Sequence, residues 1–189
     1  MNPALKIELL TVADYLAGEE QGLVRHEFVD GQVFAMAGAS QEHNIIALNV
    51  ASTLRARLRG SPCRAFIGDM KTRVAAGNRD QFYYPDIVVT CDPRDTERYF
   101  KCFPKVVIEV LSEATERIDR TEKFWSYAQI ETLEEYVLIA QDRMEVTVYR
   151  RENRWEPEVF SSVHGRVRVD ALQLDLAFDE IYEGLKLPS

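Results

Sequence analysis

The chain has 189 residues, of which 46% are hydrophobic and 29% charged, and its net charge is −8. This composition is typical of one globular domain over residues 1–189 and excludes a disordered chain, which has few core-forming residues. No segment approaches the roughly 20 apolar residues that a membrane helix needs. The N-terminus also lacks the basic and apolar regions of a signal peptide, so we expect a cytoplasmic protein without a membrane partner.

The three cysteines support the same expectation. They are odd in number and show no C-x-x-C spacing. Such cysteines are expected to be reduced, and without a cluster of Cys and His they exclude a structural zinc site.

The acidic net charge conceals a basic segment. Residues 55–80 contain seven basic side chains against two acids, a local charge of +5 that leaves −13 for the rest of the chain. A basic surface can bind a phosphate backbone even on an acidic domain, but it can also be a solvated face that acids balance elsewhere. Both interpretations stay open. The first one predicts nucleic-acid contacts from Arg55, Arg57, Arg59, Lys71 and Arg73.

Capping residues, apolar periodicity and turn residues predict the order of elements. The expected helices are 11–19, 40–58, a segment that begins at Asp119 with Glu122 as its capping partner, and 178–184. The expected strands are a hairpin within 24–36, then 63–74, 82–90, 105–111, 135–140, 144–150, 155–160 and 166–170. Because helices and strands do not alternate strictly, we expect a mixed sheet with helices packed on it.

Two of these strands contain an acid where a core residue is expected. Asp86 follows Pro85 in a run of β-forming residues, and Glu109 shares a strand face with Val107 and Leu111 in KVVIEVL. A lone buried carboxylate is costly unless it is paired or bound to a metal, and two of them in successive strands are expected to converge. Converging carboxylates suit a hard cation such as Mg²⁺. Alone, either acid could be a turn residue or half of a structural ion pair.

A cation follows on the next helix. Lys123 is expected in its first turns, near the C-terminal end of the Glu109 strand. An ammonium group there could stabilise developing charge or orient a nucleophile. Taken alone, Lys123 is more typical of a surface lysine.

Taken together, these segments resemble a known family. Asp86 after Pro85, with Glu109 some twenty residues downstream, resembles the PD-(D/E)xK nuclease signature of a Pro-Asp pair and an acid-x-Lys triplet on neighbouring strands. The Uma-two family of this superfamily is similar over residues 10–185, through RHEFVDGQVFAMAGAS, EHN, GDMKTRV, YYPDIVV, VVIEVLS and DRTEKFWSY. The resemblance implies an α/β (α+β-like) fold with a restriction-endonuclease-like core, a mixed central β-sheet flanked by helices, and an N-terminal β-hairpin.

The resemblance also implies roles for particular residues. Position 111 of the triplet holds Leu111 instead of lysine, and the family suggests that the lysine has migrated to Lys123. Asp86 and Glu109 then become metal ligands, with the carbonyl of Val110 as a further ligand. Lys123 becomes the catalytic lysine.

Other residues have two interpretations each. Glu27 matches a recurrent acidic position of the family, although a cross-strand ion pair explains it equally well. Asp69 could line the same cleft, and His43 could donate to a phosphate from a helix N-terminus or simply lie in the first turn of that helix. Three aromatic residues could stack on bases, but strand and helix aromatics more often belong to the core: Tyr83, Tyr84 and Trp125.

We therefore hypothesise a Mg²⁺- or Mn²⁺-dependent endonuclease that hydrolyses DNA phosphodiester bonds. A chain of this length holds little beyond a catalytic core, so cutting both strands favours a homodimer. Two alternatives use the same residues. One is a non-catalytic nucleic-acid-binding module, in which Leu111 marks a lost lysine, and the other is a glycosidase with one acid and one base. The sequence does not separate DNA from RNA, or endonuclease from exonuclease.

Overall fold

The computed structural model describes residues 9–76, 79–162 and 164–187, with the backbone alone for Ala76 and Arg79. Its helices are α1 (Val12–Gln21), α2 (Gln41–Arg57), α3 (Glu116–Ile118), a π-helical turn (Asp119–Lys123), α4 (Phe124–Tyr127), a 3₁₀ turn (Asp170–Leu172) and α5 (Phe178–Ile181). Its strands are β1 (His26–Val29), β2 (Gln32–Ala35), β3 (Arg64–Ile67), β4 (Lys71–Ala76), β5 (Arg79–Tyr83), β6 (Ile87–Thr90), β7 (Phe100–Lys101), β8 (Pro104–Leu111), β9 (Glu135–Ala140), β10 (Val146–Arg150), β11 (Pro157–Phe160), β12 (Arg166–Val169) and β13 (Leu174–Ala177). Within these residues, no helix is long and apolar enough to cross a membrane.

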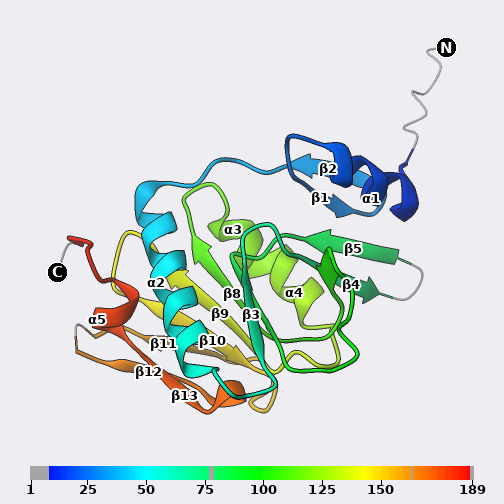
Figure 1. Cartoon of the computed structure of the whole chain (residues 1–189). Coiled ribbons are helices and arrows are strands. Elements are labelled where there is room, and N and C mark those ends of the chain that lie inside the picture. Colours follow the sequence, from blue (N-terminus) through cyan, green and yellow to red (C-terminus); the bar gives the residue numbers. More distant parts are fainter. Residues whose placement is uncertain (1–8, 77–78, 163, 188–189) are drawn as a thin grey trace.

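The strands form two large sheets and one smaller pair. The five-stranded sheet has the order β2-β1-β5-β4-β7, the six-stranded sheet has the order β11-β10-β9-β8-β6-β3, and β12 pairs with β13. The β8–β9 and β4–β7 pairs are parallel and the other described pairs antiparallel. The predicted mixed sheet with flanking helices is confirmed. Figure 1 shows β1, β2 and α1 at one end of the molecule and the β12–β13 pair with α5 at the other.

Strand β8 separates two hydrophobic cores. Val106, Ile108 and Val110 belong to the core that packs beneath α2, whereas Val107 and Leu111 belong to the core that packs beneath α4. A strand covered on both faces has an almost continuous apolar sequence, which explains KVVIEVL. Glu109 lies on the α4 side of this strand.

Two of the expected strands break where the chain passes from one large sheet to the other. The expected strand 63–74 breaks at Gly68, whose φ of +65° suits a turn, into β3 and β4. The expected strand 82–90 breaks into β5 and β6 at Pro85, which has no N–H for a strand ladder, and Asp86. The backbone N–H of Gly68 donates to the carbonyl of Asp86 at 3.0 Å, which joins the two crossing points. Asp86 therefore lies between the sheets and not within a strand.

Two further expectations are wrong. The helical segment begins at Glu116 and not at Asp119, so Asp119 lies inside the helix and does not form a cap with Glu122. The hydroxyl of Ser112 instead accepts from the N–H of Thr115 at 3.2 Å in the turn before it. Strand β13 (Leu174–Ala177) was not expected from the sequence and pairs with β12.

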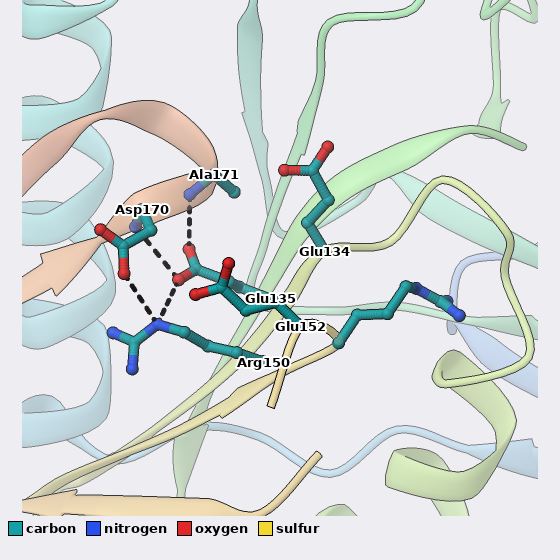
Figure 2. Close-up of a pocket in the computed structure, with 7 residues that line it drawn as sticks. Glu134, Glu135, Arg150, Glu152, Asp170 and Ala171 are labelled. Carbon is teal, nitrogen blue, oxygen red and sulfur yellow. Dashed lines mark hydrogen bonds and ion pairs between the residues drawn. The ribbon is translucent and has the colours of Figure 1, made fainter. Parts of the chain in front are cut away.

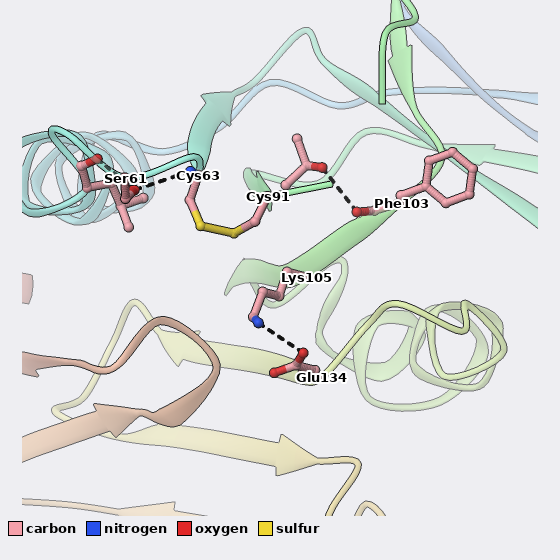
Figure 3. Close-up of a disulfide and its surroundings, with 8 residues drawn as sticks. Ser61, Cys63, Cys91, Phe103, Lys105 and Glu134 are labelled. Carbon is pink, nitrogen blue, oxygen red and sulfur yellow. Dashed lines mark hydrogen bonds and ion pairs between the residues drawn. A yellow bond between two sulfur atoms is a disulfide. The ribbon is translucent and has the colours of Figure 1, made fainter. Parts of the chain in front are cut away.

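The expectation of three reduced cysteines is also wrong. Cys63 and Cys91 form a disulfide, and Cys102 is free. Cys63 immediately precedes β3 and Cys91 immediately follows β6, and the register of this antiparallel pair places them side by side (Figure 3). Their separation of 28 residues conceals this contact in the sequence. The cytoplasmic location stays a prediction.

Candidate active site

Asp86 and Glu109 are bound to each other where the two sheets meet. The N–H of Asp86 donates to Glu109 Oε2 at 3.0 Å, and the N–H of Val110 donates to Asp86 Oδ2 at 2.7 Å. Strand β6 begins only at Ile87, which pairs with Ile108. Beyond that pair the Val110 N–H bonds to the Asp86 carboxylate. The structure thus brings together the two acids that the sequence singled out.

Lys123 lies among three carboxylates. Its Nζ is 2.9 Å from Glu27 Oε1, 3.4 Å from Asp119 Oδ1 and 3.5 Å from Glu109 Oε1. Only 8% of Lys123 is exposed. The surface-lysine interpretation is therefore wrong. Glu27 pairs with Lys123 of the helical segment and not with a basic residue of a neighbouring strand, and its Oε1 also accepts from the Tyr84 N–H at 3.3 Å.

Two residues of this site were not predicted from the sequence. Asp119 and Tyr127 precede and follow Lys123 by four residues, so the three side chains lie along one side of the helical segment. The Tyr127 hydroxyl donates to Glu109 Oε1 at 3.3 Å. Asp119 is buried, and among the described residues its Oδ1 has an ion-pair contact with Lys123 but no hydrogen-bond partner. The four-residue spacing around Lys123 was the available signal, and the π-helical turn, a feature frequent at functional sites, carries both Asp119 and Lys123.

His43 approaches the same acids from α2. Ser40 caps this helix by accepting from the His43 N–H at 3.1 Å, and His43 Nε2 lies 3.1 Å from Asp86 Oδ2. Burial lowers the pKa of His43, but the hydrogen bond and charge of Asp86, helped by Asp119 and the Val110 backbone, outweigh it and raise this pKa above 6.5. The imidazole is therefore directed to a carboxylate.

The site carries more negative than positive charge. The carboxylates of Glu27, Asp86, Glu109 and Asp119 face one ammonium group and one imidazole. Burial raises the pKa of Glu109 well above 4.5, which Lys123 opposes and Asp119 and Asp86 reinforce. Burial likewise raises the pKa of Asp119. Burial lowers the pKa of Lys123, but the surrounding carboxylates raise it by more than burial lowers it. The lysine therefore stays protonated.

The acids of this site are of the kind that binds a divalent cation. In the described part of the chain, no three His, Cys, Asp or Glu side chains are grouped to hold a metal ion. Mg²⁺ uses fewer protein ligands, since it is commonly bound by one or two carboxylates and keeps several waters. Asp86 and Glu109 provide hard oxygen donors beside the Val110 backbone, and their charge is not fully balanced. The donor set fits a hard divalent cation.

Most residues of the basic segment lie away from these acids. Arg55 and Arg57 are in the last turn of α2 and Arg59 follows it, about 18 Å along the helix from His43 at 1.5 Å per residue. Arg57 binds Glu180 and the carbonyl of Asp175. Arg55 and Arg59 are exposed and have no ion pair among the described contacts, so they are the members of this set that best suit a phosphate backbone.

The remaining predicted contacts have other partners. Lys71 is buried and its Nζ lies 3.3 Å from the Tyr84 hydroxyl, so it is excluded from the predicted interface. Arg73 donates twice to Asp80, at 3.0 and 2.9 Å. The side chain of Asp69 is 79% exposed and lies 3.5 Å from Arg25. None of the contacts described for Asp69 is with the acidic site.

The aromatic residues divide between core and surface. Tyr83 and Tyr84 are buried, as the core interpretation predicts. Trp125 is 66% exposed, so the core interpretation is wrong for this residue.

A separate hollow of about 350 Å³ is lined by residues of another network: Glu134, Glu135, Arg150, Arg151, Glu152, Asp170 and Ala171. Figure 2 shows Arg150 and the backbone N–H groups of Asp170 and Ala171 directed at Glu135. Arg150 Nε lies 2.8 Å from Glu135 Oε1 and 3.2 Å from Asp170 Oδ2. Because the buried charges of Glu135 and Arg150 are already paired, we interpret the residues that line this hollow as a structural ion-pair network. It shares no residue with the acidic site.

Comparisons with known proteins agree with this fold. The model of the Uma2 family, described as "Putative restriction endonuclease", matches residues 12–180. Two uncharacterised proteins of Synechocystis sp. are similar: slr1290 is 32% identical over 97% of both chains, and sll1609 is 31% identical over 78% of this chain and 85% of its own. A crystal structure from Anabaena variabilis, described as "a putative nuclease belonging to DUF820", superposes with a TM-score of 0.73 at 20% identity, over 92% of this chain and 97% of that one.

Proposed function

The chain belongs to the Uma2 family, and we propose that it is a Mg²⁺- or Mn²⁺-dependent endonuclease that hydrolyses DNA phosphodiester bonds. The observation that carries the proposal is the convergence of Asp86 from the β5–β6 connection, Glu109 from β8 and Lys123 from the π-helical turn. The family description points to nuclease chemistry in general. The metal, the DNA substrate and the internal position of the cut are parts of our proposal.

In this proposal Asp86, Glu109 and the Val110 carbonyl hold the metal. A bound divalent cation would lower the pKa of a coordinated water and stabilise charge on the phosphate. The Val110 N–H and His43 fix the Asp86 carboxylate, and the Asp86 N–H fixes Glu109. Both acids are thereby oriented before a substrate arrives.

Lys123 supplies a fixed positive charge. Because its pKa is raised, its ammonium group stays protonated beside Glu109 and can stabilise the negative charge that develops on a phosphate under attack. Glu27 and Asp119 position this group from two sides. The lysine therefore reaches the acids from the helix, as the family resemblance implies, and Leu111 is a buried core residue.

We further propose that the chain forms one nuclease domain, that it acts as a homodimer, and that Arg55 and Arg59 contact the nucleic-acid backbone. Their side chains are exposed, and phosphate contacts of this kind position a duplex without reading its sequence.

The test is cleavage of supercoiled and linear DNA with Mg²⁺ or Mn²⁺, with RNA as a parallel substrate. We expect metal-dependent nicking by the wild type, none by Asp86→Ala, and wild-type nicking by Asp69→Ala. The control removes the same side chain at a position exposed and bound only to Arg25 among the described contacts. Thermal unfolding of each variant shows whether it is folded.

Three outcomes would contradict the proposal. Cleavage that survives Asp86→Ala points to a contaminant or another site. Cleavage of RNA alone refutes the DNA substrate. Absence of cleavage together with absence of Mg²⁺ or Mn²⁺ binding by titration calorimetry favours a nucleic-acid-binding module on the same fold.

A further inference from the structure

Strand β2 is the outermost strand of the five-stranded sheet. It pairs with β1 on one side, and within the described residues no strand pairs with its other side. Val33 and Phe34 are 41% and 52% exposed although they point to opposite faces of the strand. Figure 1 shows the β1–β2 hairpin at the outer end of the molecule. Both faces and the free edge of β2 are therefore open to a partner.

The other outer strands of the two large sheets carry residues that discourage pairing. Strand β11 contains Pro157 and Glu158, β3 begins with Arg64, and β7 has only two residues, a length that itself limits pairing. Proline and charged side chains are the usual protection of a sheet edge. By contrast, residues 31–41 contain no charged side chain. The unprotected edge of β2 is thus an exception among the described outer strands of the two large sheets.

We propose that β2 is a dimerisation strand, which pairs in antiparallel fashion with β2 of a second copy of the chain. Each copy carries a net charge of −8, so two copies repel over most of their surfaces and meet most easily at an uncharged segment. Antiparallel pairing of one strand with itself is symmetric, so each contact is made twice. A basic or acidic partner would require charged residues that this segment lacks.

The register connects this interface to the acidic site. Glu27 on β1 lies opposite Phe34 on β2, so the two side chains share a face of the sheet. In the proposed dimer the two β1 strands are separated by three strand spacings, about 14 Å. This consequence rests on the proposed function: the Glu27 side chains of the two acidic sites would lie on the same face of one continuous sheet.

The test is the molar mass in solution, measured by light scattering and sedimentation between 1 and 100 µM. We expect a particle of twice 21.7 kDa for the wild type, a dissociation constant raised at least tenfold in Val33→Lys, and wild-type association in Val159→Lys. The control makes the same substitution at a 60% exposed valine of β11. Amide hydrogen exchange of the wild type adds a test without substitution, because the β2 amides should become more protected as the concentration rises.

A monomer at 100 µM overturns the proposal, as does Val33→Lys that is folded and dimerises like the wild type. Because none of these measurements uses nuclease activity, the dimer and the proposed function can fail separately. The Asp86→Ala variant should dimerise normally.

Discussion

Substitution of Lys123 by methionine should cost much of the stability of the metal-free protein. The change keeps the aliphatic part of the side chain and removes the charge that lies 2.9–3.5 Å from three carboxylates. At an effective dielectric constant near 20, each such contact is worth about 5 kcal/mol, most of which offsets the cost of burying the ammonium group. Loss of one partner of a buried pair usually costs about 3–5 kcal/mol. For a chain of this size we therefore expect the melting temperature to fall by about 6–20 °C.

The assay is thermal unfolding followed by circular dichroism in EDTA, with Lys105→Met as the matched control. Lys105 also forms an ion pair, at 3.0 Å from Glu134 Oε1, but both side chains are partly exposed, and such pairs contribute at most about 1 kcal/mol. Since the remaining carboxylates can protonate, the Lys123→Met variant should recover stability as the pH falls. Equal melting temperatures of the two variants would refute the idea that Lys123 compensates a buried cluster of acids.

Two further predictions concern stability. Cys63→Ser with Cys91→Ser opens a disulfide that spans 28 residues, so we expect a loss of about 3.5 kcal/mol in chemical denaturation; Cys102→Ser is the control, and a double variant as stable as that control would contradict the estimate. Because the pKa of Asp119 is raised above its ordinary 3.8, the stability that its protonated form contributes is present below that value and is lost as the pH rises through the raised pKa. The melting temperature of Asp119→Asn relative to the wild type should therefore increase as the pH rises from 4 to 8 in EDTA. A difference that stays constant or decreases would show that ionisation of Asp119 does not destabilise the fold.

The sequence was sufficient for features that depend on neighbouring residues. The Asp30-Gly31 pair predicted the hairpin, and its φ values of 50° and 83° are those that a tight hairpin turn requires. Thr11 and Ser40 cap the helices that follow them. Glu109 in its apolar strand and Asp86 after Pro85 identified the two acids.

Contacts between distant segments were determined only by the tertiary structure. At Gly68 and Pro85 the chain passes from one sheet to the other. The alternation of apolar residues in a strand does not show to which sheet that strand belongs. The same holds for Asp119, which became part of the acidic site only when its helix packed against β8.

The sequence thus singled out the two acids of the proposed site, because an acid in an apolar strand is unfavourable wherever that strand lies. The tertiary structure decided which cations reach those acids and which do not. Lys123 and His43 contact them, whereas the arginines at the end of α2 remain apart although they belong to the most basic segment. The physical reason is that the charge of a side chain is local, but its partner depends on the packing of segments far apart in the chain.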